Sequence, residues 1–237
     1  MSKKLHEDVY EQVGVAMTCR SYQEYVDMFS LTTELMEKGP ILDVGAGASS
    51  FTAEANQKGL TAIAVDPLYD MEPHAIYIKG KQEIAESTEK LARLASAFHW
   101  DYYGSLDRHQ KNREDSLERF IRAYAADEAK KTFIPGLLPH LPFEDDQFSL
   151  VVGSHFLFLY HQQFDEQFHL NALTELVRVC RPGGQVRLYP TVGLNRQPYK
   201  NLAKLMSTME ERGYKAILEP TLFRFLDGAT HYLRISK

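Results

Sequence analysis

The sequence of 237 residues predicts an α/β fold, a doubly wound and mostly parallel β-sheet with helices on both faces. Short apolar runs alternate with segments of helical periodicity, which is typical of parallel strands joined by crossover helices. One run, residues 148–152, is continuously apolar, as in a strand buried on both faces. Two strand candidates near the end of the chain are joined through Asp227-Gly228 and indicate an antiparallel hairpin. We expect a single domain over residues 1–237.

The first expected element is an N-terminal helical cover, residues 1–39. Aromatic and aliphatic side chains recur there at three- and four-residue spacing, which predicts one face of an amphipathic helix through residue 38: Tyr22, Tyr25, Val26 and Phe29. Gly39-Pro40 ends this helix, because proline has no N–H with which to continue it.

A strand, a glycine-rich turn and a helix follow the cover. Residues 41–44 are a short apolar run, and residues 49–58 form a helix with a hydroxyl cap and Gly59 as its stop. A second strand, residues 62–65, ends at Asp66-Pro67. This order predicts a βαβ unit and therefore parallel strands.

The middle of the chain, residues 82–131, is a polar helical insertion, longer than a crossover requires. It carries an apolar stripe of Leu117, Phe120, Ile121 and Tyr124. The insertion either covers a ligand site, with aromatic walls from Trp100, Tyr102 and Tyr103, or forms a solvated helical pair or a dimer face using Phe120 and Tyr124.

The parallel pattern resumes after the insertion. The segments expected as strands are 132–134, 148–152 and 185–189, and helices are expected over 165–180 and 199–212. The terminal hairpin consists of residues 216–225 and 231–235.

Charge and cysteine content narrow the class of protein. The formal charge of -5 leaves no overall basic field for a polyanion, so nucleic acid is a disfavoured partner. The densest apolar run, residues 150–160, is too short to cross a bilayer, and no export signal follows the first residues. Cys19 and Cys180 are not spaced as metal ligands or as a disulfide framework. We therefore expect a cytoplasmic protein that is not associated with membranes.

The turn after the first strand carries the main candidate site. Gly45 and Gly47 have no Cβ and let a ligand approach the backbone closely. Ser50 stands where the dinucleotide fingerprint has its third glycine, which weakens a pyrophosphate site. Asp66, nineteen residues after Gly47, can accept hydrogen bonds from both hydroxyls of a ribose. These residues favour a nucleoside ligand.

Four motifs in order resemble those of the class I S-adenosylmethionine-dependent methyltransferase family. The first is Asp43-x-Gly45-x-Gly47 and the second is Asp66. The third is Leu141-Pro142-Phe143 with Asp145, Asp146 and Phe148, and the fourth is residues 176–184 with their Arg-Pro-Gly-Gly turn. The resemblance covers residues 41–189 and implies a Rossmann-like seven-stranded sheet and S-adenosyl-L-methionine as cofactor.

The resemblance also implies roles for single residues. Gly45 and Gly47 would flank the methionine part of the cofactor, Asp43 would orient it, Asp66 would hold the ribose, and Ser154 would lie near it. The family often has an acidic residue before the third motif, where this chain has Leu137-Leu138-Pro139, so backbone groups of Leu137 and Leu138 would meet the adenine.

Each of these residues has a purely structural alternative. Asp43 could accept backbone N–H bonds at the turn, and Asp66 could cap the next segment. Tyr69 lies either against the adenine or ribose or in a surface groove.

The acceptor side is less defined. The fourth strand ends in Gly153-Ser154-His155-Phe156, which lacks the Asn/Asp-Pro-Pro-Tyr pattern of family members that methylate exocyclic or amide nitrogens. His155 is either a proton acceptor during transfer or a packed core histidine. Weaker candidates for the acceptor pocket are Tyr160, His161 and Tyr189. The nine histidines show no compact ligand pattern, so no metal is expected.

We therefore expect a methyltransferase with a small-molecule acceptor, which forms a homodimer if the insertion is an interface. Two alternatives stay open, a non-catalytic S-adenosylmethionine-binding sensor or partner subunit and a nicotinamide-dependent oxidoreductase. Ser50 and the Arg-Pro-Gly-Gly turn weaken the second.

Overall fold

The computed structural model describes residues 14–126 and 129–237, and the structural statements below refer to these residues. Their sheet has seven strands in the order β3-β2-β1-β4-β5-β7-β6. Strands β1 to β5 are parallel, and β7 is antiparallel to both β5 and β6. The strands are β1 (Ile41–Val44), β2 (Ala62–Val65), β3 (Phe133–Ile134), β4 (Phe148–Ser154), β5 (Cys180–Tyr189), β6 (Lys215–Pro220) and β7 (His231–Ser236). The predicted doubly wound fold is confirmed.

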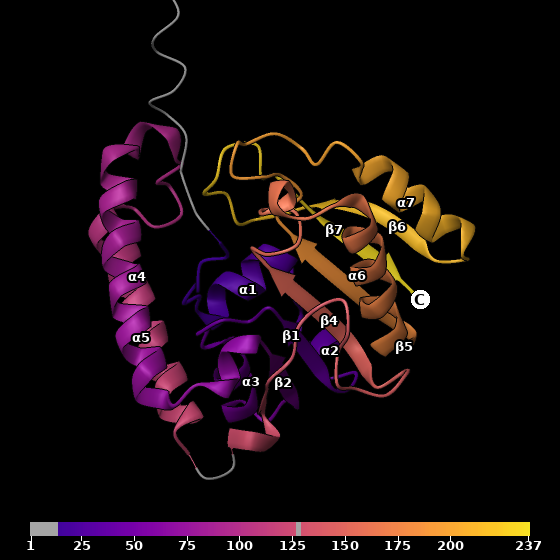
Figure 1. Cartoon of the computed structure of the whole chain (residues 1–237), viewed down its shortest axis with the longest axis horizontal. Helices are drawn as coiled ribbons and strands as arrows, with labels where there is room; N and C mark the ends of the chain where they lie inside the picture. The colour runs from indigo at the N-terminus through magenta and orange to yellow at the C-terminus, as the bar shows by residue number, and fades with distance from the viewer. Residues whose placement is uncertain (1–13, 127–128) are drawn as a thin grey trace, which may run out of the picture.

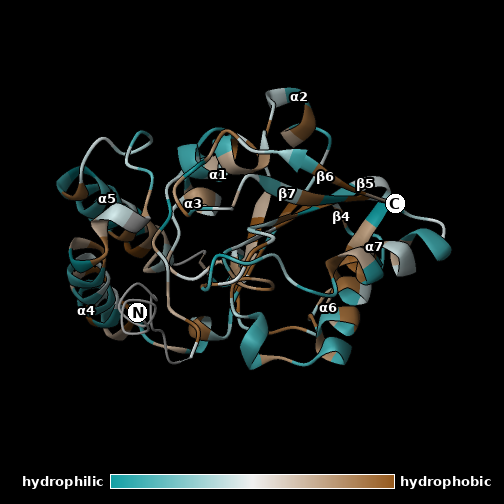
Figure 2. Cartoon of the chain, turned by 90° about the horizontal axis from the view of Figure 1, so that it is seen from above, coloured by the Kyte–Doolittle hydropathy of each residue, from teal (hydrophilic) through white to brown (hydrophobic). Residues whose placement is uncertain are grey.

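Helices cover both faces of this sheet (Figure 1). One layer is α6 (Glu166–Val179) with α7 (Leu202–Glu211), and the opposite layer is α1 (Tyr22–Phe29), α2 (Thr33–Met36) and α3 (Phe51–Gln57). Successive strand residues point to opposite faces. In β1, Leu42 and Val44 therefore join the α6–α7 core, whereas Ile41 joins the core under α1 and α3. Figure 2 shows hydrophobic stretches in the middle of the sheet between these layers, whereas β6 and β7 also carry hydrophilic residues.

The helical insertion consists of α4 (Pro73–Arg93) and α5 (Leu106–Tyr124), which lie side by side at one edge of the molecule (Figure 1). It begins earlier than the predicted residue 82. A Cβ on Gly80 of α4 would lie 2.8 Å from both Cδ atoms of Leu117, so a larger residue there would force the buried Leu117 side chain to shift. The predicted apolar stripe is confirmed, and its Phe120 is 0% exposed within the subunit. Phe120 is therefore not available for a dimer face.

The prediction of one helix through residue 38 is wrong. Residues 1–13 lie outside the described part, and residues 14–20 are not helical. Helix α1 begins only after Ser21, whose side chain and that of Glu24 form a capping box, and it ends at Ser30 in a left-handed conformation (φ 50°). The predicted apolar face nevertheless packs in the core under α1 and α3.

The terminal hairpin is shorter than predicted. Strand β6 ends at Pro220, because proline has no N–H for the ladder, and residues 221–230 fold back over α1. The hydroxyl of Thr221 donates to the carbonyl oxygen of Met28 (2.9 Å) and accepts from the N–H of Phe223 (3.0 Å). Phe223 and Phe225 are buried as a result and not exposed along a strand.

The other predicted strands and helices are present, with ends that differ by a few residues. The largest difference is in β5, which begins at Cys180 because Cys180 pairs with Phe148 before a bulge in the ladder. None of the helices in the described part of the chain is both long enough and apolar enough to cross a membrane.

Candidate functional site

The predicted glycine turn and carboxylate meet at the carboxyl edge of the parallel strands. The N–H of Gly47 donates to Oδ2 of Asp66 (2.9 Å), and the N–H of Leu68 donates to Oδ1 (2.9 Å). Asp66 therefore caps the next segment, as the structural alternative expected. A carboxylate has about four acceptor positions, so two remain for ligand hydroxyls. Burial raises the pKa of Asp66.

The turn itself depends on two left-handed glycines, Gly45 (φ +64°) and Gly47 (φ +58°). A Cβ on Gly47 would lie 3.0 Å from the carbonyl oxygen of Thr18, and one on Gly45 would lie 3.4 Å from Cβ of Phe156. The extended segment 14–20 thus runs directly over the turn. A larger residue at either glycine would strain the backbone, and one at Gly47 would also crowd Thr18.

Asp43 is fully buried beneath the turn. Its Oδ1 accepts a hydrogen bond from the hydroxyl of Tyr25 (3.1 Å), and its Oδ2 has no partner among the described residues. The alternative in which Asp43 accepts backbone N–H bonds is therefore not observed. Burial raises the pKa of Asp43 well above its ordinary value.

Tyr69 and the Leu137-Leu138 segment lie beside this turn. The ring of Tyr69 is buried and stacks on Phe120, and its hydroxyl donates to the carbonyl oxygen of Gly47 (2.8 Å). Tyr69 thus fills an internal space and not a surface groove. The side chain of Leu137 is exposed while Leu138 is buried, and the carbonyl oxygen of Leu137 accepts from the N–H of His140 (3.1 Å).

A cavity of about 390 Å³ lies between segment 16–20, the two insertion helices and the loop after β4. Its polar lining includes Arg20, Glu83, His109, Arg113, His155 and Tyr160. Of the sequence-predicted acceptor candidates, His155 and Tyr160 line it, but His161 and Tyr189 do not. Trp100, Tyr102 and Tyr103 pack behind the wall, against Phe223 and Phe225.

His155 is buried at the end of β4 in a left-handed conformation (φ 53°). Its Nδ1 lies 2.9 Å from Oγ of Ser154, which is also buried. Burial, and then the charges of Arg20 and Arg113, lower the pKa of His155 well below 6.5, so its ring is neutral at pH 7. No group of three or more His, Cys, Asp or Glu within residues 14–126 and 129–237 is arranged to hold a metal ion.

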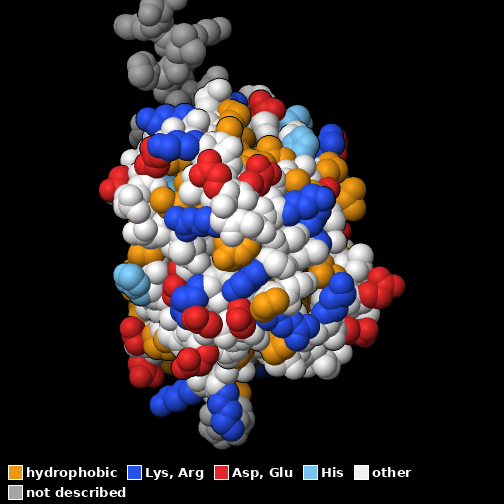
Figure 3. All heavy atoms as spheres, turned by 90° about the vertical axis from the view of Figure 1, so that its right-hand side faces the viewer, with side chains coloured by type: hydrophobic (Ala, Val, Ile, Leu, Met, Phe, Trp, Pro, Cys, Tyr) orange, Lys and Arg blue, Asp and Glu red, His pale blue; other side chains and the backbone are white. Residues whose placement is uncertain are grey.

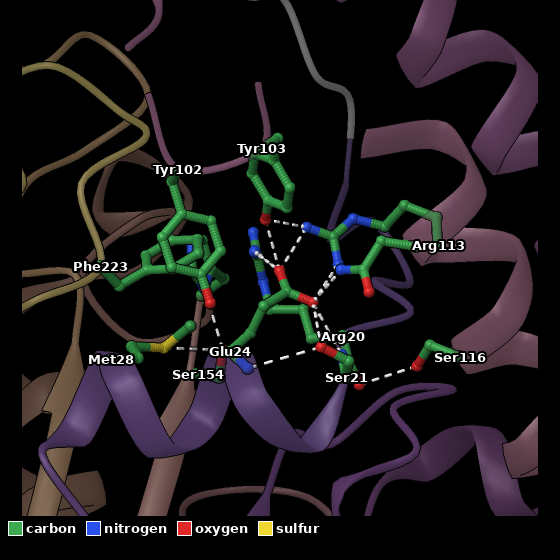
Figure 4. Close-up of polar contacts among 12 residues, drawn as sticks. Arg20, Ser21, Glu24, Met28, Tyr102, Tyr103, Arg113, Ser116, Ser154 and Phe223 are labelled. Atoms are coloured by element: carbon green, nitrogen blue, oxygen red, sulfur yellow. Dashed lines mark hydrogen bonds and ion pairs between the residues drawn. The ribbon is translucent and has the colours of Figure 1, made fainter. Parts of the chain in front are cut away.

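The structure adds a buried ionic cluster that sequence reasoning missed (Figure 4). Glu24 accepts from Nη1 of Arg113 (2.8 Å), from Nη2 of Arg113 (2.6 Å) and from Nη1 of Arg20 (3.1 Å). The hydroxyl of Tyr103 also donates to it, and Asn112 donates from its amide (2.7 Å). The Ser21-x-x-Glu24 spacing signals a capping box, but nothing local signals a partner 89 residues away. This cluster joins α1 to the insertion, and its Arg20 and Arg113 line the cavity.

We predict that His109 makes stability depend on pH. Burial, and then Arg113 and Arg20, lower its pKa from 6.5 to about 2. Below pH ~6.5 the unfolded chain takes up a proton that the folded chain does not, so acidification favours unfolding, by up to about 1.4 kcal/mol per pH unit. Urea unfolding of the wild type and of His109→Gln at several pH values between about 7.5 and 5 should show a shallower slope for the variant. His74→Gln, at an exposed position, is the control and should retain the wild-type slope. Equal slopes for wild type and His109→Gln would contradict the assignment.

Comparisons with known proteins concern the family and the fold of this chain. Residues 106–188 match the family model described as a methyltransferase domain. An uncharacterized protein of Methanocaldococcus jannaschii is 32% identical over 220 residues, which cover 92% of this chain and 94% of that protein. Among solved structures, an O-methyltransferase family protein from Burkholderia thailandensis aligns with 91% of this chain and 55% of its own, at 10% identity and a TM-score of 0.50, which supports the fold. A putative S-adenosyl-L-methionine-dependent methyltransferase from Methanococcus maripaludis aligns with 91% of this chain and 83% of its own, at 14% identity and a TM-score of 0.44.

Proposed function

Because the chain belongs to the class I S-adenosylmethionine-dependent methyltransferase family, whose cofactor is S-adenosyl-L-methionine, we propose that it methylates a small organic molecule held in the 390 Å³ cavity. The observation that carries this proposal is the position of that cavity. It lies against segment 16–20, which covers the glycine turn, and beside His155 at the carboxyl end of β4. A volume of this size suits a small ligand and not a polymer.

The residues at the turn fit the cofactor. Oδ2 of Asp43 lacks a partner among the described residues, Asp66 retains acceptor positions for ribose hydroxyls, and Gly45 and Gly47 add no side chain to the turn. When bound, the cofactor supplies an electrophilic methyl group. We assign Asp43, Gly45, Gly47 and Asp66 to its binding, and backbone groups of Leu137 and Leu138 to its adenine. Ser154 would lie beside it, and Tyr69 positions the turn through its hydrogen bond to Gly47.

His155 is our candidate for the proton acceptor. Nδ1 of the neutral ring lies within hydrogen-bond distance of Oγ of Ser154 (2.9 Å), and in the tautomer whose Nδ1–H donates to Oγ, Nε2 carries the lone pair. Nε2 would take the proton that a hydroxyl, amine or thiol acceptor releases. Much of the rate enhancement would come from holding the acceptor atom in line with the methyl group.

We also infer that the protein acts in the cytoplasm as one domain and on small molecules, not nucleic acid. Basic and acidic side chains are interspersed on the face shown in Figure 3, with no continuous basic stripe for a polyanion. The formal charge of -5 supports the same inference.

The test is the affinity of an Asp66→Ala variant for S-adenosylhomocysteine, measured by calorimetry. Loss of the charged acceptor for the ribose hydroxyls should weaken binding by about 1.5 to 3 kcal/mol, or roughly 10- to 150-fold. Asp70→Ala, an exposed carboxylate four residues further on, is the matched control and should bind like the wild type. A folded Asp66→Ala protein with wild-type affinity would remove the assignment. Transfer of label from radiolabelled S-adenosylmethionine to small molecules of a cell extract then tests catalysis, and absence of transfer with intact binding would contradict it.

A further inference from the structure

The ionic cluster of Arg20, Arg113 and Glu24 beside the cavity holds more positive than negative charge. Arg20 and Arg113 both pair with the carboxylate of Glu24, at 3.1 Å and 2.6 Å. All three side chains are buried: Arg20 is 7% exposed, Arg113 5% and Glu24 1%. Two guanidinium groups on one carboxylate leave a net charge of about +1 in a place with little access to water.

Arg20 carries this excess. Arg113 uses both of its terminal nitrogens on Glu24 and also donates to the carbonyl oxygen of Cys19 (2.9 Å) and to the hydroxyl of Tyr103. The guanidinium of Arg20 makes one hydrogen bond within the described residues, from Nη1 to Glu24, and its Nε has no partner there. Arg20 lines the cavity and lies 5.4 Å from the centre of the Phe223 ring, which stabilises it only weakly.

The rest of the lining does not balance the excess. Its other charged side chains are two basic and two acidic: Lys79, Lys90, Glu83 and Glu86. Glu83 lies 4.0 Å from Lys79 and also accepts from the N–H of Met17 (2.8 Å). The remaining walls are largely apolar, with Ile84, Leu91, Leu159, Phe98 and Phe225. An unbalanced buried cation in an apolar cavity favours an anionic ligand.

We propose that the cavity binds a small organic carboxylate, whose carboxylate group pairs with Arg20 and whose apolar body lies against Phe225 and Leu159. This inference rests on the proposed function, since it gives the chemical class of the methyl acceptor. A carboxylate at Arg20 places the rest of the acceptor in the cavity that His155 also lines. The positive charges of Arg20 and Arg113 lower the pKa of His155, and the negative charge of the bound carboxylate partly offsets them.

The test uses matched acid and amide pairs as probes: benzoate with benzamide, phenylacetate with phenylacetamide, and indole-3-acetate with indole-3-acetamide. Binding to the full-length protein is measured by calorimetry in the presence of saturating S-adenosylhomocysteine. At least one acid should bind about tenfold or more tightly than its amide, as expected for a charge-assisted hydrogen bond. Arg20→Met should abolish this preference, and Arg20→Lys should retain part of it. If no acid binds better than its amide, the proposal is overturned.

A second measurement separates a binding role of Arg20 from a structural one. Without ligand, the thermal midpoint of Arg20→Met should stay unchanged or rise, because Glu24 keeps its bidentate partner and the excess charge is gone. Arg113→Met, the matched change on the other guanidinium, should lower the midpoint. A clear loss of stability in Arg20→Met would mean that Arg20 is structural and would overturn the proposal.

A third measurement identifies the source of the anion, because the cofactor carries a carboxylate too. S-adenosylhomocysteine contains that carboxylate and 5′-methylthioadenosine lacks it. If Arg20→Met weakens binding of the first and not of the second, Arg20 binds the cofactor, and the acceptor assignment is overturned. We expect both nucleosides to bind Arg20→Met as they bind the wild type. Failure of both to bind the wild type would instead contradict the proposed function.

Discussion

Replacing Glu24 by alanine is expected to destabilise the folded protein by about 3 to 5 kcal/mol, the usual range when one member of a buried ion pair is removed. The change leaves Arg20 and Arg113 buried without a counter-charge and removes the acceptor for Tyr103 and Asn112. It also removes the carboxylate that accepts from the N–H of Ser21 (2.8 Å) at the start of α1. Urea unfolding followed by circular dichroism at pH ~7 measures the effect.

The pH dependence of this effect identifies its electrostatic origin. Burial raises the pKa of Glu24, but Arg113 and Arg20 outweigh it and hold the pKa far below 4.5. A depressed folded pKa means that the stabilisation is complete above pH ~4.5 and is lost as the pH falls towards the folded value. The difference between wild type and Glu24→Ala should therefore be constant at neutral pH and shrink below pH ~4.5.

Gln23→Ala provides the matched control for Glu24. Gln23 precedes Glu24 on α1 but is exposed, and within the described residues its side chain bonds only to Asp27 (2.9 Å). Its loss should change stability by no more than about 0.5 kcal/mol. If Gln23→Ala and Glu24→Ala have similar effects, Glu24 is not the electrostatic centre described here.

The sequence predicts those parts of the fold that depend on local signals, and it misses those that depend on contacts between residues distant in the chain. The βαβ unit at residues 41–65 follows from local signals, an apolar run, a glycine turn and a glycine stop, and it folds as expected. Residues 221–225 are predicted as part of a strand because Leu222 to Phe225 has strand composition, whereas their conformation depends on Thr221 bonding to α1. Thr221 and α1 are distant in sequence, so no local pattern records that contact.

The candidate site likewise contains residues whose positions were predictable from the sequence and residues whose positions were not. The juxtaposition of Gly47 and Asp66 was predictable, because parallel strands bring their carboxyl ends to one edge of the sheet. The buried pairing of Glu24 with Arg20 and Arg113 was not predictable. A buried charged residue in a polar helix such as α5 cannot be told from a solvated one by sequence until its partner is known. Arg113 lies in a heavily charged segment and is 5% exposed only because α5 packs against segment 14–20 and α1.

Replacing Phe120 by alanine is the second change with a large expected effect, again about 3 to 5 kcal/mol of lost stability. Phe120 is 0% exposed and packs against Tyr69, Tyr124 and Phe133, with ring centroids 5.3 to 6.0 Å apart. Removing its ring leaves a cavity between α5 and the sheet. Urea unfolding measures the loss, and Arg122→Ala, two residues further along α5 and exposed, should change stability by no more than about 0.5 kcal/mol.

Phe120→Ala also tests whether the insertion only covers the acceptor cavity or also supports the glycine turn at the cofactor site. Tyr69 stacks on Phe120 and donates to the carbonyl oxygen of Gly47, so loosening Tyr69 should weaken S-adenosylhomocysteine binding by about 1 kcal/mol, or roughly fivefold. An insertion that only covered the acceptor would leave cofactor affinity unchanged in the folded variant. Because Leu117, Phe120 and Arg113 are all buried against the rest of the chain, we expect deletion of residues 82–131 to unfold the protein. The single substitution is therefore the informative experiment: reduced affinity in folded Phe120→Ala would show that the insertion supports the glycine turn, and wild-type affinity would restrict it to the acceptor cavity.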